Sequence, residues 1–314
     1  MIKETLNLVT TKDGEQVAVW KVFDSIKDST LVDSHASKKQ NVLLTHGTFS
    51  DKRVCLGVAK YLAKLGHTCY IVEWRGHGDS SIPKDKFNFE TVAIYDLEAT
   101  FHYLFDGLKL DNLHCITHSG GGICLTMFLI QEILAQNTQY INKINSITMF
   151  ACQAYGAVIN PKSYARILLI KSITRLLGYL PAKRLKLGTI NENYHTMSQW
   201  YDWNLNKNFK SSLAKQDVNY QNTDYNENFD YRQHMPKVTI PIYAISAKGD
   251  DFIAPFSGCQ LFLNDFNNPA NDFCEFSISN GDLEDYSHSR IIMSRNASKE
   301  IWPTVAAWIE KHGT

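Results

Sequence analysis

The residues best suited to do chemistry lie in the segment 113–125, which reads Leu-His-Cys-Ile-Thr-His-Ser-Gly-Gly-Gly-Ile-Cys-Leu. An apolar strand pattern runs into a serine and small residues, and an apolar helix pattern follows at once. This arrangement mounts a serine on a sharp strand-to-helix turn with its hydroxyl exposed. Gly120 and Gly121 are the small neighbours that the turn needs, although Thr117 replaces the first glycine of the usual Gly-x-Ser-x-Gly pattern. The pattern favours Ser119 as a nucleophile over a plain glycine-rich turn.

A serine hydroxyl attacks well only when a base takes its proton, so a histidine oriented by a carboxylate must lie nearby. On a sheet with this kind of turn, the chain order is serine, then acid, then histidine. After the last expected strand only His288 and His312 remain, and His312 is two residues from the end of the chain. We therefore expect His288, in the polar loop 285–289, to be the general base.

The acid should follow the penultimate strand, which we expect at 241–247. The loop after it, 248–255, carries two adjacent carboxylates, Asp250 and Asp251. Neighbouring side chains point in different directions, so we expect only one of them to face His288. The residues alone leave the choice between them open.

Acyl transfer also needs two backbone N–H groups aimed at the developing oxyanion. One should come from Gly120, the residue after the nucleophile. The other should come from the loop that follows the strand 41–45, where Gly47 lets the backbone approach the substrate closely. The second donor is then Thr48 or Phe49, and the sequence does not distinguish them.

The elements that must position these residues alternate between strand and helix patterns along most of the chain. After an opening hairpin (5–10 and 16–23), strands are expected at 41–45, 68–74, before Ser119, and at 144–151, 241–247 and 272–277. Helices are expected at 52–65, 90–105, after Ser119 and at 302–311. Short apolar strands separated by helices predict an α/β fold, with a mostly parallel central sheet flanked by helices. Functional groups collect at the carboxyl ends of such strands, where the candidate residues stand.

One region interrupts this alternation and divides the chain into core residues 1–156, an insertion at 157–236 and core residues 237–314. It is too long for a loop and has helix patterns at 164–180 and 191–208. We interpret it as a helical cap over the active edge of the sheet. Tyr194, Trp200 and Trp203 are candidate substrate-binding residues, with core packing as the alternative for the two tryptophans. We do not favour lipid contact for the apolar face of 164–180.

These motifs together resemble the α/β-hydrolase superfamily. The resemblance covers both flanks of the chain, about three quarters of its length, and leaves the insertion uncovered. It rests on His46-Gly47, Arg75-Gly76-His77-Gly78-Asp79-Ser80, His118-Ser119-Gly120-Gly121, the segment 249–255 and the loop around His288.

The resemblance implies a serine hydrolase with a lid and the α/β-hydrolase fold. Hydrolases of this fold often carry Asp-x-x-x-Pro after the penultimate strand, and Asp251 with Pro255 matches that spacing, so Asp251 is preferred to Asp250 as the acid. His46 and His77 are expected to have structural roles. The implied substrate is a small carboxylic ester, and the aromatic and aliphatic insertion favours an apolar acyl or alkyl group. A thioesterase, peptidase or acyltransferase with the same triad, or a non-catalytic binding protein, stays an alternative.

Composition limits the classes of partner. Lys+Arg and Asp+Glu are balanced at 32 each, which gives no electrostatic footprint for nucleic acid. No apolar run approaches the length of a membrane span, and the N-terminus lacks the apolar run of a signal peptide. The seven scattered cysteines suit buried positions in a reducing compartment, so we expect a cytoplasmic protein without cofactor or metal. The oligomeric state stays open.

Overall fold

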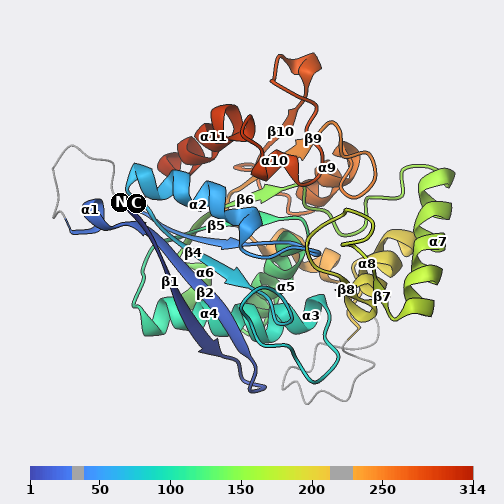
Figure 1. Ribbon diagram of the computed structural model, residues 1–314, viewed down its shortest axis with the longest axis horizontal. Helices are drawn as coiled ribbons and strands as arrows, with labels where there is room; N and C mark the ends of the chain where they lie inside the picture. Colours follow the sequence, from blue (N-terminus) through green and yellow to red (C-terminus); the bar gives the residue numbers. More distant parts are fainter. Residues whose placement is uncertain (30–38, 213–228, 314) are drawn as a thin grey trace.

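An eight-stranded sheet forms the centre of the computed structural model, which describes residues 1–29, 39–212 and 229–313 (Figure 1). β1 pairs antiparallel with β2, and β2 pairs antiparallel with β4, whereas the neighbouring pairs beyond β4 are parallel. This confirms the predicted α/β class and the mostly parallel sheet. The strands lie in the order β1 (Ile2–Thr10), β2 (Gln16–Asp24), β4 (Thr68–Glu73), β3 (Asn41–Thr45), β5 (Leu113–His118), β6 (Ile144–Phe150), β9 (Ile242–Ala247) and β10 (Asp272–Phe276).

The central strands are apolar because both of their faces are buried. In β4, Tyr70 and Val72 enter the core on one side of the sheet, and Cys69 and Ile71 enter the core on the other side. Successive side chains of a strand point to opposite faces, so each such strand supplies both cores. Helices must therefore cover the sheet on both sides.

Two groups of helices cover these faces (Figure 1). One face carries α2 (Arg53–Leu65), α10 (Arg290–Met293) and α11 (Ala297–Lys311). The other carries α3 (Phe89–Thr91), α4 (Glu98–His102), α5 (Gly120–Leu134) and α6 (Thr138–Ile141), with the π-helical turns η1 (Val92–Leu97) and η2 (Tyr103–Gly107). The helix expected at 90–105 is therefore present, with two π-helical turns within it. The remaining short elements outside the insertion are α1 (Ser25–Ser29), α9 (Phe256–Asn264) and η5 (Ile278–Asn280).

The chain between β6 and β9 holds the helices of the predicted insertion. α8 lies between α7 and the rest of the molecule, so α7 stands at the outer edge (Figure 1). The described elements are α7 (Pro161–Leu177), the two-stranded β7 (Tyr179–Leu180) and β8 (Glu192–Asn193), α8 (Tyr194–Asn206) and η4 (Tyr231–Lys237). Residues 213–228 of the predicted 157–236 insertion lie outside the described residues, and the three-part division of the chain stays a prediction.

The apolar face of α7 is present but mostly uncovered. The helix begins at Asn160, whose side chain accepts from Ser163 N–H, and it ends at Gly178 with φ 77°. Among its residues, only Ser163, Ile167 and Thr174 are buried. Leu169 is 61% exposed and Leu176 is 87% exposed. This helix therefore presents leucines to solvent instead of a packed face.

Candidate active site

Ser119 stands on the sharp turn that the sequence predicts between β5 and α5. Its φ of 52° lies in the left-handed region that non-glycine residues seldom adopt, and its N–H donates to Phe150 O at 2.9 Å. A Cβ at Gly47 would lie 2.7 Å from Ser119 Cβ, so only glycine allows the two loops to approach this closely. Thr117, at the position of the missing glycine, is buried with its hydroxyl 3.4 Å from Cys152 Sγ. The turn thus forms despite the threonine.

Three distant side chains meet at this turn. Ser119 Oγ lies 2.8 Å from His288 Nε2, and His288 Nδ1 lies 2.5 Å from Asp250 Oδ2. A carboxylate can only accept here, so Nδ1–H donates to Asp250 and Nε2 accepts from the Ser119 hydroxyl. This tautomer leaves His288 ready to take the serine proton.

The preference for Asp251 over Asp250 is wrong, because the structure pairs His288 with Asp250. Asp250 is buried against His288, whereas Asp251 is exposed to solvent. Asp250 N–H donates to Ala247 O in a turn that directly follows β9, and this turn points the Asp250 side chain inward. The next side chain then points outward. The Asp-x-x-x-Pro spacing selected the wrong one of the two carboxylates.

Asp250 is held as a carboxylate. Burial alone would raise its pKa, but the imidazole of His288 and the N–H groups of Ile253 and Ala254 outweigh burial and hold the pKa below its ordinary value. The backbone donors also fix the orientation of the carboxylate. The acceptor is therefore charged and in place at neutral pH.

His118 forms a hydrogen bond with the backbone of the loop that carries His288, a contact that the sequence analysis did not predict. Its Nε2–H donates to His288 O at 2.9 Å, and the two rings lie 4.9 Å apart. Burial, with a smaller contribution from the nearby His288, lowers the pKa of His118 to about 3. His118 is therefore a neutral donor that holds the backbone of the loop. Its position next to Ser119 is the one signal that could have indicated this contact from the sequence.

The backbone around Thr48 and Phe49 lies beside Ser119, at the border of the same cavity as Gly120. Gly120 is the first residue of α5, where helix geometry gives an N–H no acceptor within the helix. Phe49 has φ 66°, and its carbonyl accepts from Thr189 N–H at 2.8 Å. These positions suit an oxyanion cradle, and Thr48 and Phe49 stay the two predicted sources of its second N–H.

The insertion touches this loop directly. Besides Thr189, Ile190 donates its N–H to Phe49 O at 3.0 Å. A Cβ at Gly188 would lie 2.3 Å from the same oxygen, so a side chain there would push the segment away. The segment 188–190 is thus bonded to the loop that carries the oxyanion candidates.

His46 shapes the same loop, in agreement with the structural role expected for it. It accepts from Trp74 N–H through Nε2, and its Nδ1–H donates to Gly47 O at 2.7 Å. Burial, assisted by the nearby His77, lowers the pKa of His46 to about 3, so this imidazole is neutral. Within the described part of the chain, the hydrogen bonds of the His46 ring go to Trp74 and Gly47 and not to Ser119.

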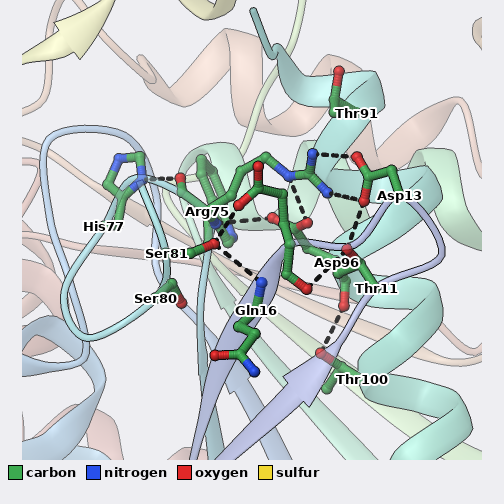
Figure 2. Close-up of polar contacts among 12 residues, drawn as sticks. Thr11, Asp13, Gln16, Arg75, His77, Ser80, Ser81, Thr91, Asp96 and Thr100 are labelled. Atoms are coloured by element: carbon green, nitrogen blue, oxygen red, sulfur yellow. Dashed lines mark hydrogen bonds and ion pairs between the residues drawn. The ribbon is translucent and has the colours of Figure 1, made fainter. Parts of the chain in front are cut away.

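The expected turn at 75–80 is anchored by an ion network in which Arg75 and Asp96 are buried and Asp13 is exposed (Figure 2). Arg75 Nε donates to Asp96 Oδ1 at 2.7 Å, and its terminal nitrogens donate to Asp13 at 2.6 and 3.0 Å. Asp96 also accepts from Arg75 N–H at 2.9 Å. The network ties the β1–β2 turn to η1. Because its partners are far apart in the sequence, no local pattern could have found it.

A cavity of about 430 Å³ begins at Ser119 and extends under the insertion. Its walls are mainly apolar, which suits a ligand held by burial more than by hydrogen bonds. They include Ile170, Ile173, Leu180, Leu185, Leu187, Met197, Trp200 and Phe252. Two polar side chains of the insertion, Arg166 and Tyr201, also reach the walls.

Of the aromatic candidates, only Trp200 lines this cavity. Trp203 is buried, with its Nε1–H donating to Lys210 O at 2.8 Å and its ring packed edge-on against Phe209. Tyr194 is half-buried beside His195 and does not line the cavity. Trp203 thus follows the core-packing alternative, and Tyr194 lies outside the cavity wall. The residues of α8 that reach the cavity are Met197, Trp200 and Tyr201.

No cluster of three or more His, Cys, Asp or Glu side chains suited to a metal ion occurs within residues 1–29, 39–212 and 229–313. All seven cysteines are free thiols, and burial raises their pKa values. No helix in the same ranges is long and apolar enough to cross a bilayer.

Solved structures with a similar fold cover almost the whole chain. An esterase from Exiguobacterium antarcticum matches with a TM-score of 0.64 at 14% identity, over 98% of this chain and 100% of that one. An esterase from Pyrococcus furiosus matches with a TM-score of 0.60 at 15% identity, over 100% and 92% of the two chains. A structure from a study of Nitrososphaera gargenis carboxylesterases matches with a TM-score of 0.61 at 13% identity, over 97% and 99%. At these identities the likeness shows the fold alone.

The sequence itself gives an independent comparison. No curated protein matches it significantly. The family model for the alpha/beta hydrolase fold, however, matches residues 40–276, about three quarters of the chain. Together with the sheet order and the strand-to-helix turn at Ser119, this shows that the chain belongs to the α/β-hydrolase fold family.

Proposed function

We propose that this protein is a serine esterase that cleaves carboxylic esters with an apolar acyl or alkyl group through an acyl-enzyme intermediate. The observation that carries the proposal is the hydrogen-bonded chain from Ser119 through His288 to Asp250 at the end of an apolar cavity. A binding protein would have no need of these three groups in this order. The esterases of similar fold support the same reading.

In the proposed first half-reaction, Ser119 Oγ attacks the ester carbonyl carbon while His288 Nε2 takes its proton. The carbonyl π electrons move to oxygen, and the resulting oxyanion accepts from the N–H of Gly120 and from that of Thr48 or Phe49. Collapse of this intermediate breaks the bond to the leaving alcohol, which takes the proton from His288. Asp250 stabilises the imidazolium without accepting its proton.

In the second half-reaction, water attacks the acyl-enzyme. His288 takes a proton from the water and returns it to Ser119 Oγ as the carboxylic acid leaves. The enzyme regains its starting protonation state, so no co-reactant other than water is required. The neutral donor His118 keeps His288 in position throughout.

The cavity supports an apolar substrate. Its volume of about 430 Å³ is within the usual range for small-molecule sites, and most side chains on its walls carry no hydrogen-bonding group. Each methylene group that the substrate buries there contributes about 0.8 kcal/mol. We therefore expect kcat/KM to rise with acyl-chain length until the cavity is filled.

A fluorophosphonate probe tests the nucleophile. Wild-type protein should become covalently labelled, and Ser119→Ala should lose labelling and on the order of 10⁴ or more in kcat while its circular dichroism stays unchanged. Labelling that persists in folded Ser119→Ala would contradict the proposal. Absence of labelling in the wild type would favour a binding protein.

A panel of substrates tests the substrate class. p-Nitrophenyl esters of increasing acyl length should be cleaved with increasing kcat/KM, and matched thioesters and peptide amides should be poorer substrates. A preference for the thioester or the amide would replace the esterase by a thioesterase or a peptidase that uses the same residues.

A further inference from the structure

The outer surface of the insertion exposes an unusual number of large apolar side chains. We call this surface the cap face and define it as the exposed residues of α7 together with the segment 183–187. Leu176 at 87% and Leu169 at 61% are its most exposed leucines. Leu168, Leu177, Leu185 and Leu187 are exposed beside them. Contiguous apolar surface of this kind marks an interaction site, since it is costly to leave in water.

The charge of the same stretch is one-sided. Between residues 157 and 191 there is no Asp or Glu, although the whole chain carries equal numbers of acidic and basic residues. Seven basic residues stand there: Lys162, Arg166, Lys171, Arg175, Lys183, Arg184 and Lys186. Lys171 is paired with Asp202, but Arg175, Lys183, Arg184 and Lys186 are exposed among the leucines. The cap face is thus both apolar and cationic.

The cap face is continuous with the cavity of the candidate active site. Ile173, Leu185 and Leu187 are exposed at the surface and also line that cavity. Apolar contact therefore extends from the outer surface of the insertion to Ser119. α7 is also the outermost helix on this side of the molecule, so a flat surface could reach it (Figure 1).

The sequence alone did not favour lipid contact for 164–180, but the exposure of Leu169 and Leu176 reverses that preference. We propose that the cap face docks this protein onto an anionic lipid surface. Exposed leucines can insert among the acyl chains at a bilayer interface while basic residues beside them contact anionic headgroups. A second copy of the chain fits less well, because a symmetric contact through this face would bring the same unbalanced positive charges together. Lipid docking would open the cavity toward an apolar phase.

Vesicle co-sedimentation tests the proposal without depending on catalysis. Ser119→Ala protein should bind vesicles that contain phosphatidylserine and bind phosphatidylcholine vesicles much more weakly, with binding reduced by added salt. Because the probe measures binding, a failure of the esterase assignment would leave this result unchanged. Equal binding to neutral and anionic vesicles, or binding to neither, would overturn the proposal.

Two variants separate the charge from the apolar contribution. Lys183→Gln/Arg184→Gln/Lys186→Gln should lower the partition coefficient on anionic vesicles on the order of 100-fold, since each basic residue near the surface contributes about fivefold. Leu169→Gln/Leu176→Gln should lower it by roughly tenfold or more. These residues do not line the cavity, so turnover of a water-soluble ester should stay at the wild-type level.

Matched controls keep the result specific. Ile82→Gln removes a side chain as exposed as Leu176, at 87%, from a loop outside the cap face. Lys3→Gln/Lys109→Gln/Lys299→Gln makes the same change in net charge at exposed positions elsewhere. Both controls should bind vesicles as the wild type does. If the controls lost as much vesicle binding as the cap-face variants, the proposal would be contradicted. It would also be contradicted if the protein bound no vesicles and instead formed a dimer that Leu169→Gln/Leu176→Gln dissociated.

Discussion

Two long helices that are rich in Leu and Ile, α5 and α7, have opposite surroundings. α5 buries twelve of its fifteen residues, whereas α7 buries three of its seventeen. Both contain runs of Leu and Ile, but α5 has no charged residue before Glu132, and α7 has Lys or Arg at 162, 166, 171 and 175. Apolar residues at helical spacing therefore predict that a helix forms, and the charges interleaved with them indicate how much of the helix is covered.

The largest difference in kcat should be found between variants of two neighbouring carboxylates, of which Asp250 is buried and Asp251 is exposed. Asp250→Asn should reduce kcat by roughly 10³- to 10⁴-fold, because His288 would lose its charged acceptor and its correct tautomer. Asp251→Asn should leave kcat within about twofold, since its side chain points to solvent. Steady-state turnover of a p-nitrophenyl ester measures both. A larger loss for Asp251→Asn would remove Asp250 from the mechanism.

A stability test compares α5 and α7 directly. Phe128 of α5 is buried and stacks on Phe101 with ring centroids 4.4 Å apart, so Phe128→Ala should lower the free energy of unfolding by about 3–5 kcal/mol. Leu176→Ala in α7 should change it by no more than about 0.5 kcal/mol. Urea titration followed by fluorescence measures both values. Similar losses for the two variants would mean that α7 is covered in solution.

The two tryptophans of α8 should differ in what they affect. Trp200→Ala widens the cavity, so it should change the kcat/KM ratio of a long-chain to a short-chain ester by about tenfold, the scale of one or two apolar groups in a pocket. Trp203→Ala should instead destabilise the fold, because Trp203 is buried against Phe209. Chain-length profiles together with thermal melts distinguish the two effects. A change of selectivity in folded Trp203→Ala without one in Trp200→Ala would reverse this assignment.

The smallest expected effect concerns the buried pair that joins the core to the insertion. Burial opposes protonation of His77, but Glu192, 3.1 Å away, outweighs it and raises the pKa of His77 above its ordinary value. The pair therefore stabilises the fold fully below about pH 6.5, and this contribution is lost as pH rises through the folded-state pKa. The melting temperature of the wild type should fall more between about pH 6 and about pH 9 than that of His77→Gln. If the melting temperatures of the two proteins changed with pH in parallel, this stabilising role of the pair would be contradicted.

Much of the fold and part of the candidate site could be predicted from local patterns. Short apolar strands converge at one edge, and the chain order of the motifs predicted that Ser119 and His288 would lie close together, as they do. The choice of carboxylate failed because it depends on one turn after β9, in which Asp250 N–H bonds to Ala247 O. Sequence spacing cannot specify the direction of a side chain at such a turn.

Other features were inaccessible for a different reason. The network of Arg75, Asp13 and Asp96 joins three segments whose proximity only the folded sheet creates. Trp200 and Trp203 differ in role because α8 packs on two neighbours at once. In both cases the information lies in tertiary contacts and not in any window of the chain.

The bonds from Thr189 and Ile190 to the Phe49 carbonyl have a consequence for how substrate could reach the serine. Separating the segment 188–190 from the loop at Phe49 would break both hydrogen bonds and free the backbone next to the oxyanion candidates. If substrate entered by displacing this segment, part of the catalytic geometry would be lost while the substrate bound. A ligand that entered beside Ile173, Leu185 and Leu187, which are exposed and also line the cavity, would leave the segment 188–190 bonded and the reaction centre assembled.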